Sequence, residues 1–307
     1  MLKSFNQSQE MKQPPFLKKG DKIAITCPAK MLKTPITEAV ALLESWGLEV
    51  VLGSTIGAAH HQFSGTDKQR AEDMQAFIND EDVKAIIAAR GGYGCIRIVD
   101  EIDWSPLLTH PKWIIGFSDI TVFHLQLQKM EIQSLHAQMP ATVSESSKDG
   151  LESLRKALFG EAIVYNFRKC SHNKKGIAEG EIIGGNLTLL TACLNAKNDI
   201  DYADKILFIE DVGEYAYAID RMLRTLDRAG KFKYLKGLLV GDFSSIKQDD
   251  PPFGYSVKEI IDDIMPKYSF PVYFNFPAGH LPDNRALVLG RKVRLEAETE
   301  CTKLSFL

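Results

Sequence analysis

The chain has 307 residues, of which 45% are hydrophobic and 25% charged, and this composition is ordinary for a globular protein and gives no sign of disorder. A formal net charge of −3 at pH 7 supplies no broad basic face, which argues against nucleic-acid binding. At this length two domains are a better expectation than a single hydrophobic core.

The five cysteines are scattered and never form a CxxC pair, so neither a disulfide framework nor a thiolate metal site is expected. The first fifteen residues are polar and lack the apolar stretch of a signal peptide. The sequence contains no run of about 18 apolar residues, so no membrane span is predicted. We therefore expect a cytoplasmic protein with a frayed N-terminus and no membrane segment.

From Lys22 onward, short apolar runs rich in β-formers alternate with longer helical patterns. Such alternation predicts right-handed crossovers and a parallel sheet covered by helices on both faces. Sheets of this kind bind ligands at the carboxyl ends of their strands. The predicted strands are 22–26, 48–53, 83–89, 112–116 and 132–137, and the stretches at strand ends are TCPAK, ARGGYG, GFSD and HAQMP.

The pattern changes after Pro140. A polar stretch and a short helical pattern lead into the loop-rich segment YNFRKCSHNKKG. We place a boundary within 145–175 and predict an α/β domain over 17–150 and a second domain over 175–307. The second domain mixes strands and helices, and its last two apolar runs, 285–290 and 291–298, are predicted to close it as an antiparallel pair.

Ser118 lies between the predicted strand 112–116 and an amphipathic helical pattern. A turn from strand to helix exposes a side chain above the sheet, with the following amides directed at the same space. Only the first glycine of a G-x-S-x-G elbow, Gly116, is present. Two interpretations stay open from this segment alone. Ser118 or Asp119 caps the helix, or Asp119 is the cap and Ser118 is a nucleophile.

The stretch ARGGYG, residues 89–94, also joins a strand to a helix, and it matches neither the dinucleotide fingerprint nor a P-loop. Adjacent glycines let backbone N–H groups approach a ligand closely. If Ser118 attacks a carbonyl, the amides of Gly92 and Asp119 are the natural pair of oxyanion donors. A plain glycine-rich turn is the alternative.

A serine nucleophile needs a base and a group that orients the base. His280 is the best candidate base, because the prolines and glycine of NFPAGHLPDN fix its loop beyond a strand. Glu210 ends the predicted strand KILFIE, where an acid is costly unless it is paired. His136 also ends a strand, and it lines the pocket or is a buried core histidine. Asn186 is expected to cap the helix that follows it.

Taken in this order, the motifs ARGGYG, GFSD, GEIIGGNLTLL, LFIEDVGEYAYAIDRML and FPAGHLPDN resemble the L,D-carboxypeptidase family of serine peptidases. The resemblance covers nearly the whole chain from about residue 17. It implies a flavodoxin-like N-terminal domain with a parallel sheet, which holds the serine, and a smaller β-rich C-terminal domain. It further implies that Ser118 is the nucleophile, His280 the general base and Glu210 the carboxylate that orients it.

The reaction implied by the resemblance is hydrolysis of the amide between an L-centre and a C-terminal D-residue. In peptidoglycan recycling this step removes D-alanine from murein tetrapeptide, a small peptide substrate, and it needs no metal and no cofactor. The resemblance also suggests a homodimer. Candidate pocket residues are Arg90, Gly91, Tyr93 and His136.

Two other functions stay open. A related branch of the family hydrolyses acylated nucleotide antibiotics and confers self-immunity, although the short polar stretch 167–180 favours the peptidoglycan branch. A non-catalytic ligand-binding protein of flavodoxin-like fold is the second alternative, and it leaves Glu210 and His280 without a role.

Overall fold

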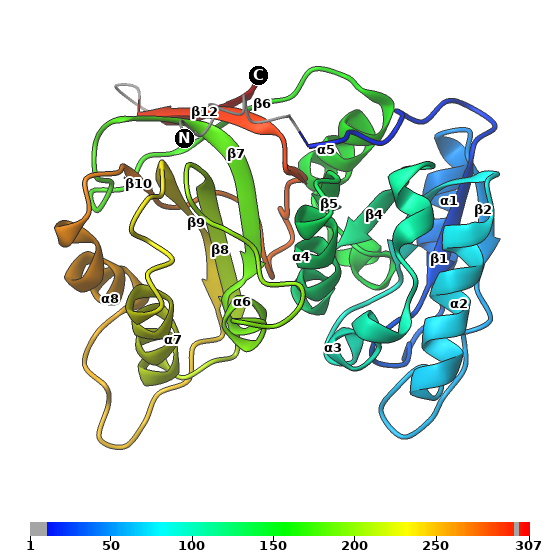
Figure 1. The fold of residues 1–307 in the computed structure, drawn as a ribbon, viewed down its shortest axis with the longest axis horizontal. Helices are drawn as coiled ribbons and strands as arrows, with labels where there is room; N and C mark the ends of the chain where they lie inside the picture. The colour runs from blue at the N-terminus through cyan, green and yellow to red at the C-terminus, as the bar shows by residue number, and fades with distance from the viewer. Residues whose placement is uncertain (1–10, 298–300) are drawn as a thin grey trace, which may run out of the picture.

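The structure, a computed structural model, describes residues 11–297 and 301–307 and has two lobes, each built on one sheet (Figure 1). The predicted frayed N-terminus lies mostly outside these residues. The first sheet has the strand order β11-β5-β4-β3-β1-β2, and all its pairs except β11–β5 are parallel. Its strands are β1 (Lys22–Thr26), β2 (Glu49–Leu52), β3 (Val83–Ala88), β4 (Trp113–Gly116), β5 (Ser134–His136) and β11 (Leu287–Leu289).

The second sheet has the order β10-β9-β8-β7-β12-β13-β6, with parallel pairing from β10 to β7 and antiparallel pairing from β7 to β6. The expected fold class, a parallel α/β lobe followed by a β-rich one, is confirmed. The strands are β6 (Val164–Arg168), β7 (Ile177–Asn186), β8 (Ile206–Val212), β9 (Gly237–Ser244), β10 (Val272–Tyr273), β12 (Lys292–Ala297) and β13 (Cys301–Phe306).

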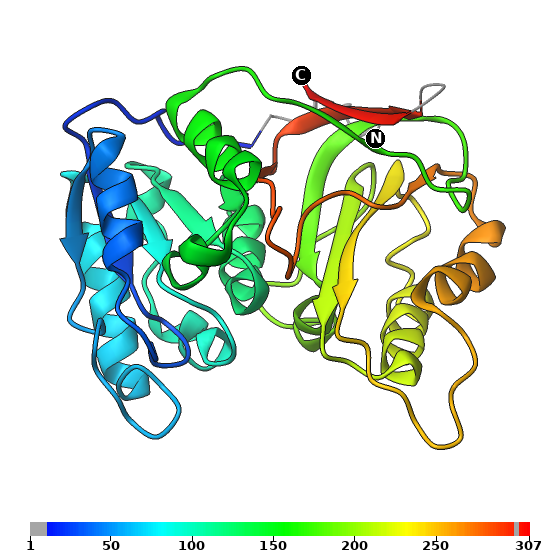
Figure 2. The same ribbon diagram turned by 180° about the vertical axis from the view of Figure 1, so that it is seen from behind.

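Helices cover both sheets, as Figures 1 and 2 show from opposite sides. Two of these helices begin at a capping box, which is set by local sequence. Thr66 and Gln69 form the capping box of α2, and Ser256 and Glu259 form that of α8. The α-helices are α1 (Thr37–Ser45), α2 (Asp67–Asn79), α3 (Cys95–Ile98), α4 (Thr121–Lys129), α5 (Lys148–Phe159), α6 (Leu187–Ala192), α7 (Ala216–Arg228) and α8 (Val257–Ile264). The 3-10 turns are η1 (Val99–Glu101), η2 (Ser105–Leu108), η3 (Ser118–Ile120), η4 (Pro140–Glu145) and η5 (Met265–Lys267).

The prediction that 285–290 and 291–298 pair with each other is wrong. Residues of β11 pair with β5 in the first sheet, whereas β12 pairs with β7 and β13 in the second. The chain therefore crosses from one lobe to the other at Gly290, which has a φ of +87°. Both segments are apolar because each is buried in its own sheet, so periodicity alone could not separate a hairpin from two unrelated strands.

The segment expected to be loop-rich contains β6. Tyr165 and Phe167 are buried, whereas the residues between and beside them are more exposed, which is the pattern of a strand with one covered face. Its partner, β13, lies more than 130 residues further along the chain. A strand at a sheet edge whose partner is so distant gives little local signal.

The two lobes pack against each other through α4 and β7. The backbone N–H of Asn186 donates to Oγ1 of Thr121 at 3.0 Å, and a Cβ on Gly185 would lie 2.6 Å from that oxygen. One hydrophobic cluster, which includes Phe123 and Ile183, continues from the first lobe into the second. The lobe contact thus fixes α4, which follows the Ser118 turn, relative to β7, the strand that pairs with β8 and its Glu210.

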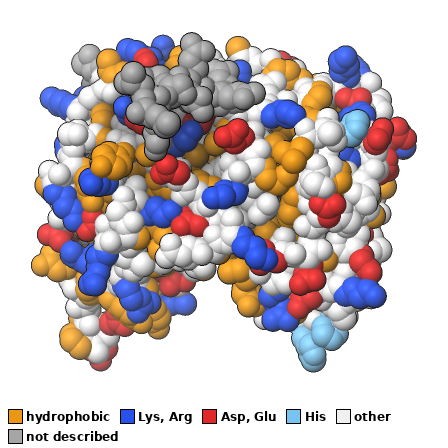
Figure 3. Space-filling model, in the orientation of Figure 1, with side chains coloured by type: hydrophobic (Ala, Val, Ile, Leu, Met, Phe, Trp, Pro, Cys, Tyr) orange, Lys and Arg blue, Asp and Glu red, His pale blue; other side chains and the backbone are white. Residues whose placement is uncertain are grey.

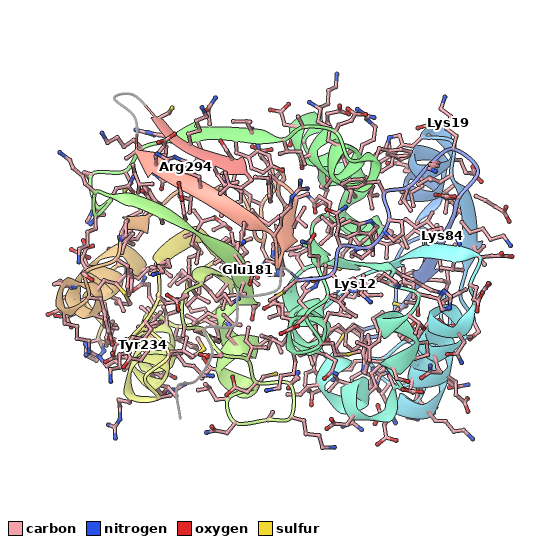
Figure 4. All side chains as sticks on the ribbon, turned by 45° about the horizontal axis from the view of Figure 1, so that its top comes forward. Lys12, Lys19, Lys84, Glu181, Tyr234 and Arg294 are labelled. Atoms are coloured by element: carbon pink, nitrogen blue, oxygen red, sulfur yellow. The ribbon has the colours of Figure 1, made fainter. Side chains whose placement is uncertain are left out.

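With the top of the molecule tilted forward, Figure 4 shows Glu181 on β7 and Arg294 on β12 in the second lobe, and Lys19 and Lys84 in the first. No helix in the described part of the chain is long and apolar enough to cross a lipid bilayer.

Candidate active site

Ser118 lies at the sharp turn between β4 and η3, with a φ of +63°. This left-handed conformation is uncommon for a residue with a side chain and costs about 1–2 kcal/mol. Gly116, before the turn, has a φ of +155°, and a Cβ there would lie 2.7 Å from Cγ1 of Ile120. The turn therefore stores strain at the position where a nucleophile was predicted.

Neither Ser118 nor Asp119 caps the helix that follows, so both capping interpretations are wrong. The carboxylate of Asp119 instead accepts a hydrogen bond of 2.9 Å from the backbone N–H of Cys95, the first residue of α3. Burial raises the pKa of Asp119, and the bond from Cys95 opposes that rise. This contact ties the Ser118 turn to the end of the ARGGYG loop.

The ARGGYG loop packs directly on the Ser118 turn. A Cβ on Gly91 would lie 3.3 Å from Cβ of Ser118 and 3.3 Å from the backbone nitrogen of Asp119. Gly92 has a φ of +115°, and a Cβ there would lie 2.7 Å from Cδ of Lys30. At Gly92 the positive φ favours glycine, and at Gly91 a side chain would require a small shift of the Ser118 turn.

His280 and Glu210 form a hydrogen-bonded pair, in which Nδ1 of His280 lies 2.8 Å from Oε2 of Glu210. The Glu210 side chain is fully buried in β8, at a point where the pairing with β9 shifts register. The His280 side chain is 20% exposed, so the ring reaches the surface of the cleft while its partner stays inside. A buried acid that fixes one ring nitrogen leaves Nε2 free to exchange a proton.

The loop around His280 allows this close approach. Gly279 has a φ of +127°, and a Cβ there would lie 3.1 Å from both Cβ and Oε2 of Glu210. The N–H of Gly279 donates to Oδ1 of Asn284 at 2.9 Å, which holds the loop closed. The His280 ring also makes an edge-on contact with Phe117, the residue before Ser118, at a centroid distance of 4.9 Å.

Burial lowers the pKa of His280, but the hydrogen bond and negative charge of Glu210 outweigh it and, with Asp211 and Asp242, hold this pKa above its ordinary value. Burial raises the pKa of Glu210, and its bond to His280 opposes the rise. The imidazolium form of His280 is thus favoured, as a general base requires once it has taken a proton.

Ser118 and His280 line the same cleft, which has a volume of about 370 Å³. The space-filling view shows a notch between the two lobes (Figure 3). The strands β8 and β9 run toward the side of the molecule on which this notch opens (Figure 2). A smaller part of about 230 Å³ continues beyond Phe117, Thr142 and His280. The larger part is lined by Leu32, Lys33, Thr34, Arg90, Gly91, Gly92, Phe117, Ser118, Met139, Ala141, Thr142, Val212 and His280.

Two candidate pocket residues lie outside this lining. The His136 ring is fully buried behind Phe117, against Phe208 at a centroid distance of 5.0 Å, so the structure corresponds to the core-histidine alternative. Tyr93 is 42% exposed and packs against Phe63 at 5.9 Å. Arg90 and Gly91 do line the cleft.

Other cleft residues were missed in the sequence. Thr142 and Glu145 come from η4, inside a stretch that looked like the polar start of a domain linker. Phe117 also lines both parts of the cleft, although no motif in the sequence marks it as a cleft residue. Asn186 caps α6 as predicted, by accepting from the N–H of Leu189 at 3.2 Å. Within residues 11–297 and 301–307, no group of three or more His, Cys, Asp and Glu side chains is placed to hold a metal ion.

Family models match both halves of the chain. The model of the LD-carboxypeptidase N-terminal domain matches residues 23–137, and that of the LD-carboxypeptidase C-terminal domain matches residues 179–295. The chain belongs to the LD-carboxypeptidase family. It is accordingly a hydrolase, a serine-type carboxypeptidase, and the resemblance seen in the sequence motifs is confirmed.

Relatives in this family span the whole chain. A Bacillus subtilis protein named probable murein peptide carboxypeptidase is 34% identical over 92% of this chain and 91% of its own. The murein tetrapeptide carboxypeptidase of Pseudomonas aeruginosa is 29% identical over 90% of this chain and 93% of its own. The crystal structure of muramoyltetrapeptide carboxypeptidase from Oxalobacter formigenes superposes with a TM-score of 0.84 at 29% identity, covering 93% of this chain and 98% of that one.

The fold is also shared with MccF, a microcin C7 self-immunity protein. Its structure in complex with glutamyl sulfamoyl guanosine superposes with a TM-score of 0.85 over 97% of this chain and 98% of that one. At 20% identity this likeness concerns the fold alone.

Proposed function

We propose that this LD-carboxypeptidase releases the C-terminal D-alanine of murein tetrapeptide in peptidoglycan recycling, with Ser118, His280 and Glu210 as its catalytic triad. The observation that carries the proposal is the hydrogen bond between the buried Glu210 and His280, whose ring lines the cleft that Ser118 also lines. The names of the relatives from Pseudomonas aeruginosa and Oxalobacter formigenes support the choice of substrate.

The reaction proceeds through an acyl-enzyme. Nε2 of His280 takes the proton of the Ser118 hydroxyl as Oγ attacks the carbonyl carbon of the scissile amide. Glu210 holds the imidazole in the required tautomer and stabilises its positive charge. His280 then protonates the departing nitrogen of D-alanine. Water attacks the ester in the same way, and Ser118 leaves with its proton restored.

Backbone amides stabilise the tetrahedral intermediate in this proposal. The nitrogen of Asp119 lies in the Ser118 turn against Gly91, and Gly92 lines the same cleft. We assign the N–H groups of Gly92 and Asp119 as the oxyanion donors, each worth about 3–4 kcal/mol of transition-state stabilisation in comparable sites. The N–H of Cys95 donates to the carboxylate of Asp119, which helps to fix the turn that carries the Asp119 amide.

The self-immunity activity is the competing function, and the stretch from Phe167 to Gly180 gives it no support. The rings in this stretch are those of Phe167, which is buried in the second sheet, and of His172, which lies against Asp262 and Phe274. The expected homodimer and cytoplasmic location stay predictions.

A substrate comparison tests the proposal. Purified protein is incubated, with EDTA present, with disaccharide tetrapeptide and separately with an aminoacyl sulfamoyl adenosine, and release of D-alanine or of the acyl amino acid is measured. We expect D-alanine from the tetrapeptide and little cleavage of the nucleotide. Preferred cleavage of the nucleotide would assign the self-immunity function, and cleavage of neither would favour a ligand-binding protein.

A further inference from the structure

The cleft has opposite charges at its two ends. The larger part, which contains Ser118, is lined by Lys33 and Arg90 and by no Asp or Glu among the described residues. The smaller part is lined by Glu145 and, within the same described ranges, by no Lys or Arg. Phe117, Thr142 and His280 line both parts and separate them. A substrate with charged groups is therefore oriented along this cleft.

Arg90 is one of the two cations that line the part of the cleft containing Ser118. It directly precedes Gly91, whose backbone packs on Ser118. The guanidinium is half-buried, and Nη1 donates a hydrogen bond of 3.0 Å to the carbonyl oxygen of Met31. No ion pair between described residues involves Arg90. One edge of the guanidinium is thus fixed to the backbone while its charge has no carboxylate partner.

Resting on the proposed function, we infer that Arg90 binds the terminal carboxylate of the peptide substrate. In a C-terminal residue only two covalent bonds, each about 1.5 Å long, separate the scissile nitrogen from the carboxylate carbon. The group that binds this carboxylate must therefore lie close to the nucleophile. Arg90 lines the same cleft as Ser118 and directly precedes the glycine that packs on it, and a guanidinium matches a carboxylate with two parallel hydrogen bonds.

Lys33 fits this role less well. Its side chain is exposed at the rim of the cleft, where solvent weakens its interaction with an anion. The half-buried Arg90 is better shielded, and its bond to Met31 reduces the entropy lost on binding.

This assignment explains why a peptidase of this architecture acts on chain ends. A peptide that continues beyond the scissile bond presents a neutral amide to Arg90, so binding buries the guanidinium without a counter-charge. A buried charge without a partner is costly, and the internal peptide is rejected. The acidic end of the cleft leaves room for the opposite, acyl side of the substrate, which for a diamino acid carries an ammonium group near Glu145.

The test compares murein tetrapeptide with its C-terminal carboxamide. We expect the wild type to prefer the free acid by at least about 100-fold in kcat/KM, as for other sites that bind a specific polar group. Arg90→Gln should reduce this preference to below about tenfold by slowing hydrolysis of the acid with little effect on the amide. Arg90→Lys should give an intermediate preference, because it keeps the charge and loses the paired hydrogen bonds.

Arg228→Gln is the matched control, since Arg228 is exposed at the far end of α7 and should leave the preference unchanged. Binding of both peptides to a Ser118→Ala background, measured by calorimetry, separates the two proposals. Acid-selective binding that disappears with Arg90→Gln supports the carboxylate site even if the intact protein releases no D-alanine. Two results would show that Arg90 does not bind the carboxylate. One is that Arg90→Gln slows hydrolysis of the free-acid peptide and the carboxamide peptide equally, and the other is that this variant binds both peptides as the wild type does.

Discussion

Nδ1 of His280 lies 2.8 Å from Oε2 of Glu210, which joins a surface loop of the second lobe to a fully buried strand. The carboxylate is therefore held in place by the sheet, and the imidazole is held by the carboxylate. The His280 ring also meets Phe117, the residue before Ser118, at a centroid distance of 4.9 Å. The position of His280 thus depends on both lobes.

The pH profile of kcat/KM should show how the negative charge of Glu210 affects the pKa of His280. His280 must be neutral to accept a proton, and Glu210 holds its pKa above 6.5, so kcat/KM of the wild type should fall as pH drops through a value above 6.5. Glu210→Gln removes the negative charge that raises the pKa of His280, whereas burial still lowers that pKa. The acid limb should then move to lower pH, while kcat falls about 10⁴-fold. An acid limb that stays in place would show that Glu210 does not control His280.

Gly279→Ala should impair catalysis more than folding. The new Cβ lies 3.1 Å from Oε2 of Glu210 at a φ of +127°, so it displaces the carboxylate that orients His280. We expect a loss of about 1–3 kcal/mol in the free energy of unfolding from backbone strain and at least a tenfold loss in kcat.

Gly230→Ala provides the control for strain alone, because Gly230 has a φ of +75° and a Cβ there meets nothing within 4 Å. Denaturant unfolding and D-alanine release are measured for both variants. Similar losses of activity in the two would mean that the contact with Glu210 is unimportant.

Ser118→Gly should be more stable than Ser118→Ala, although both are inactive. At a φ of +63° a glycine relieves strain that alanine retains, a difference of about 1 kcal/mol. At Ser171, an exposed position without a positive φ, the order should reverse, since glycine costs more unfolded-chain entropy. Thermal melts of the four variants check this, and equal melting temperatures at position 118 would mean that the turn is unstrained.

Acid should destabilise the fold through His124. Burial lowers the pKa of His124 to about 4, whereas the unfolded chain protonates near 6.5. The unfolded state thus binds more protons between these values, and the free energy of unfolding should decrease by up to about 3 kcal/mol as pH falls from 6.5 to 4. Burial of His136 acts in the same direction. A His124→Asn variant should lose stability at pH 7.5 and depend less on pH across this window, which chemical denaturation measures.

The sequence was most informative where structure is set by neighbouring residues. The parallel strands β1, β3 and β4 are short continuous apolar runs between helical patterns, so their positions and the fold class could be predicted. The glycines of ARGGYG and the loop around His280 marked places where the backbone must approach a neighbour closely. Ser118, Glu210 and His280 could be singled out as candidates because each stands at a strand end or in a rigid loop.

Contacts between distant residues could not be predicted in this way. Asp119 looked like a helix cap, but its carboxylate bonds to Cys95, whose position depends on how α3 packs. The crossing of the chain between β11 and β12 depends on pairing with β5 and β7, which periodicity does not encode. Glu145 lines the cleft, although it lies in the polar stretch where a domain boundary was predicted.

The most direct test of the central claim is D-alanine release from disaccharide tetrapeptide by wild type, Ser118→Ala and Ser171→Ala, with EDTA present throughout. Ser171 is exposed and serves as the matched serine control. The account predicts full activity in wild type and Ser171→Ala and a loss of roughly 10⁴-fold or more in kcat in Ser118→Ala, about 5 kcal/mol of transition-state stabilisation. Full activity in Ser118→Ala, or activity that requires added metal, would contradict it.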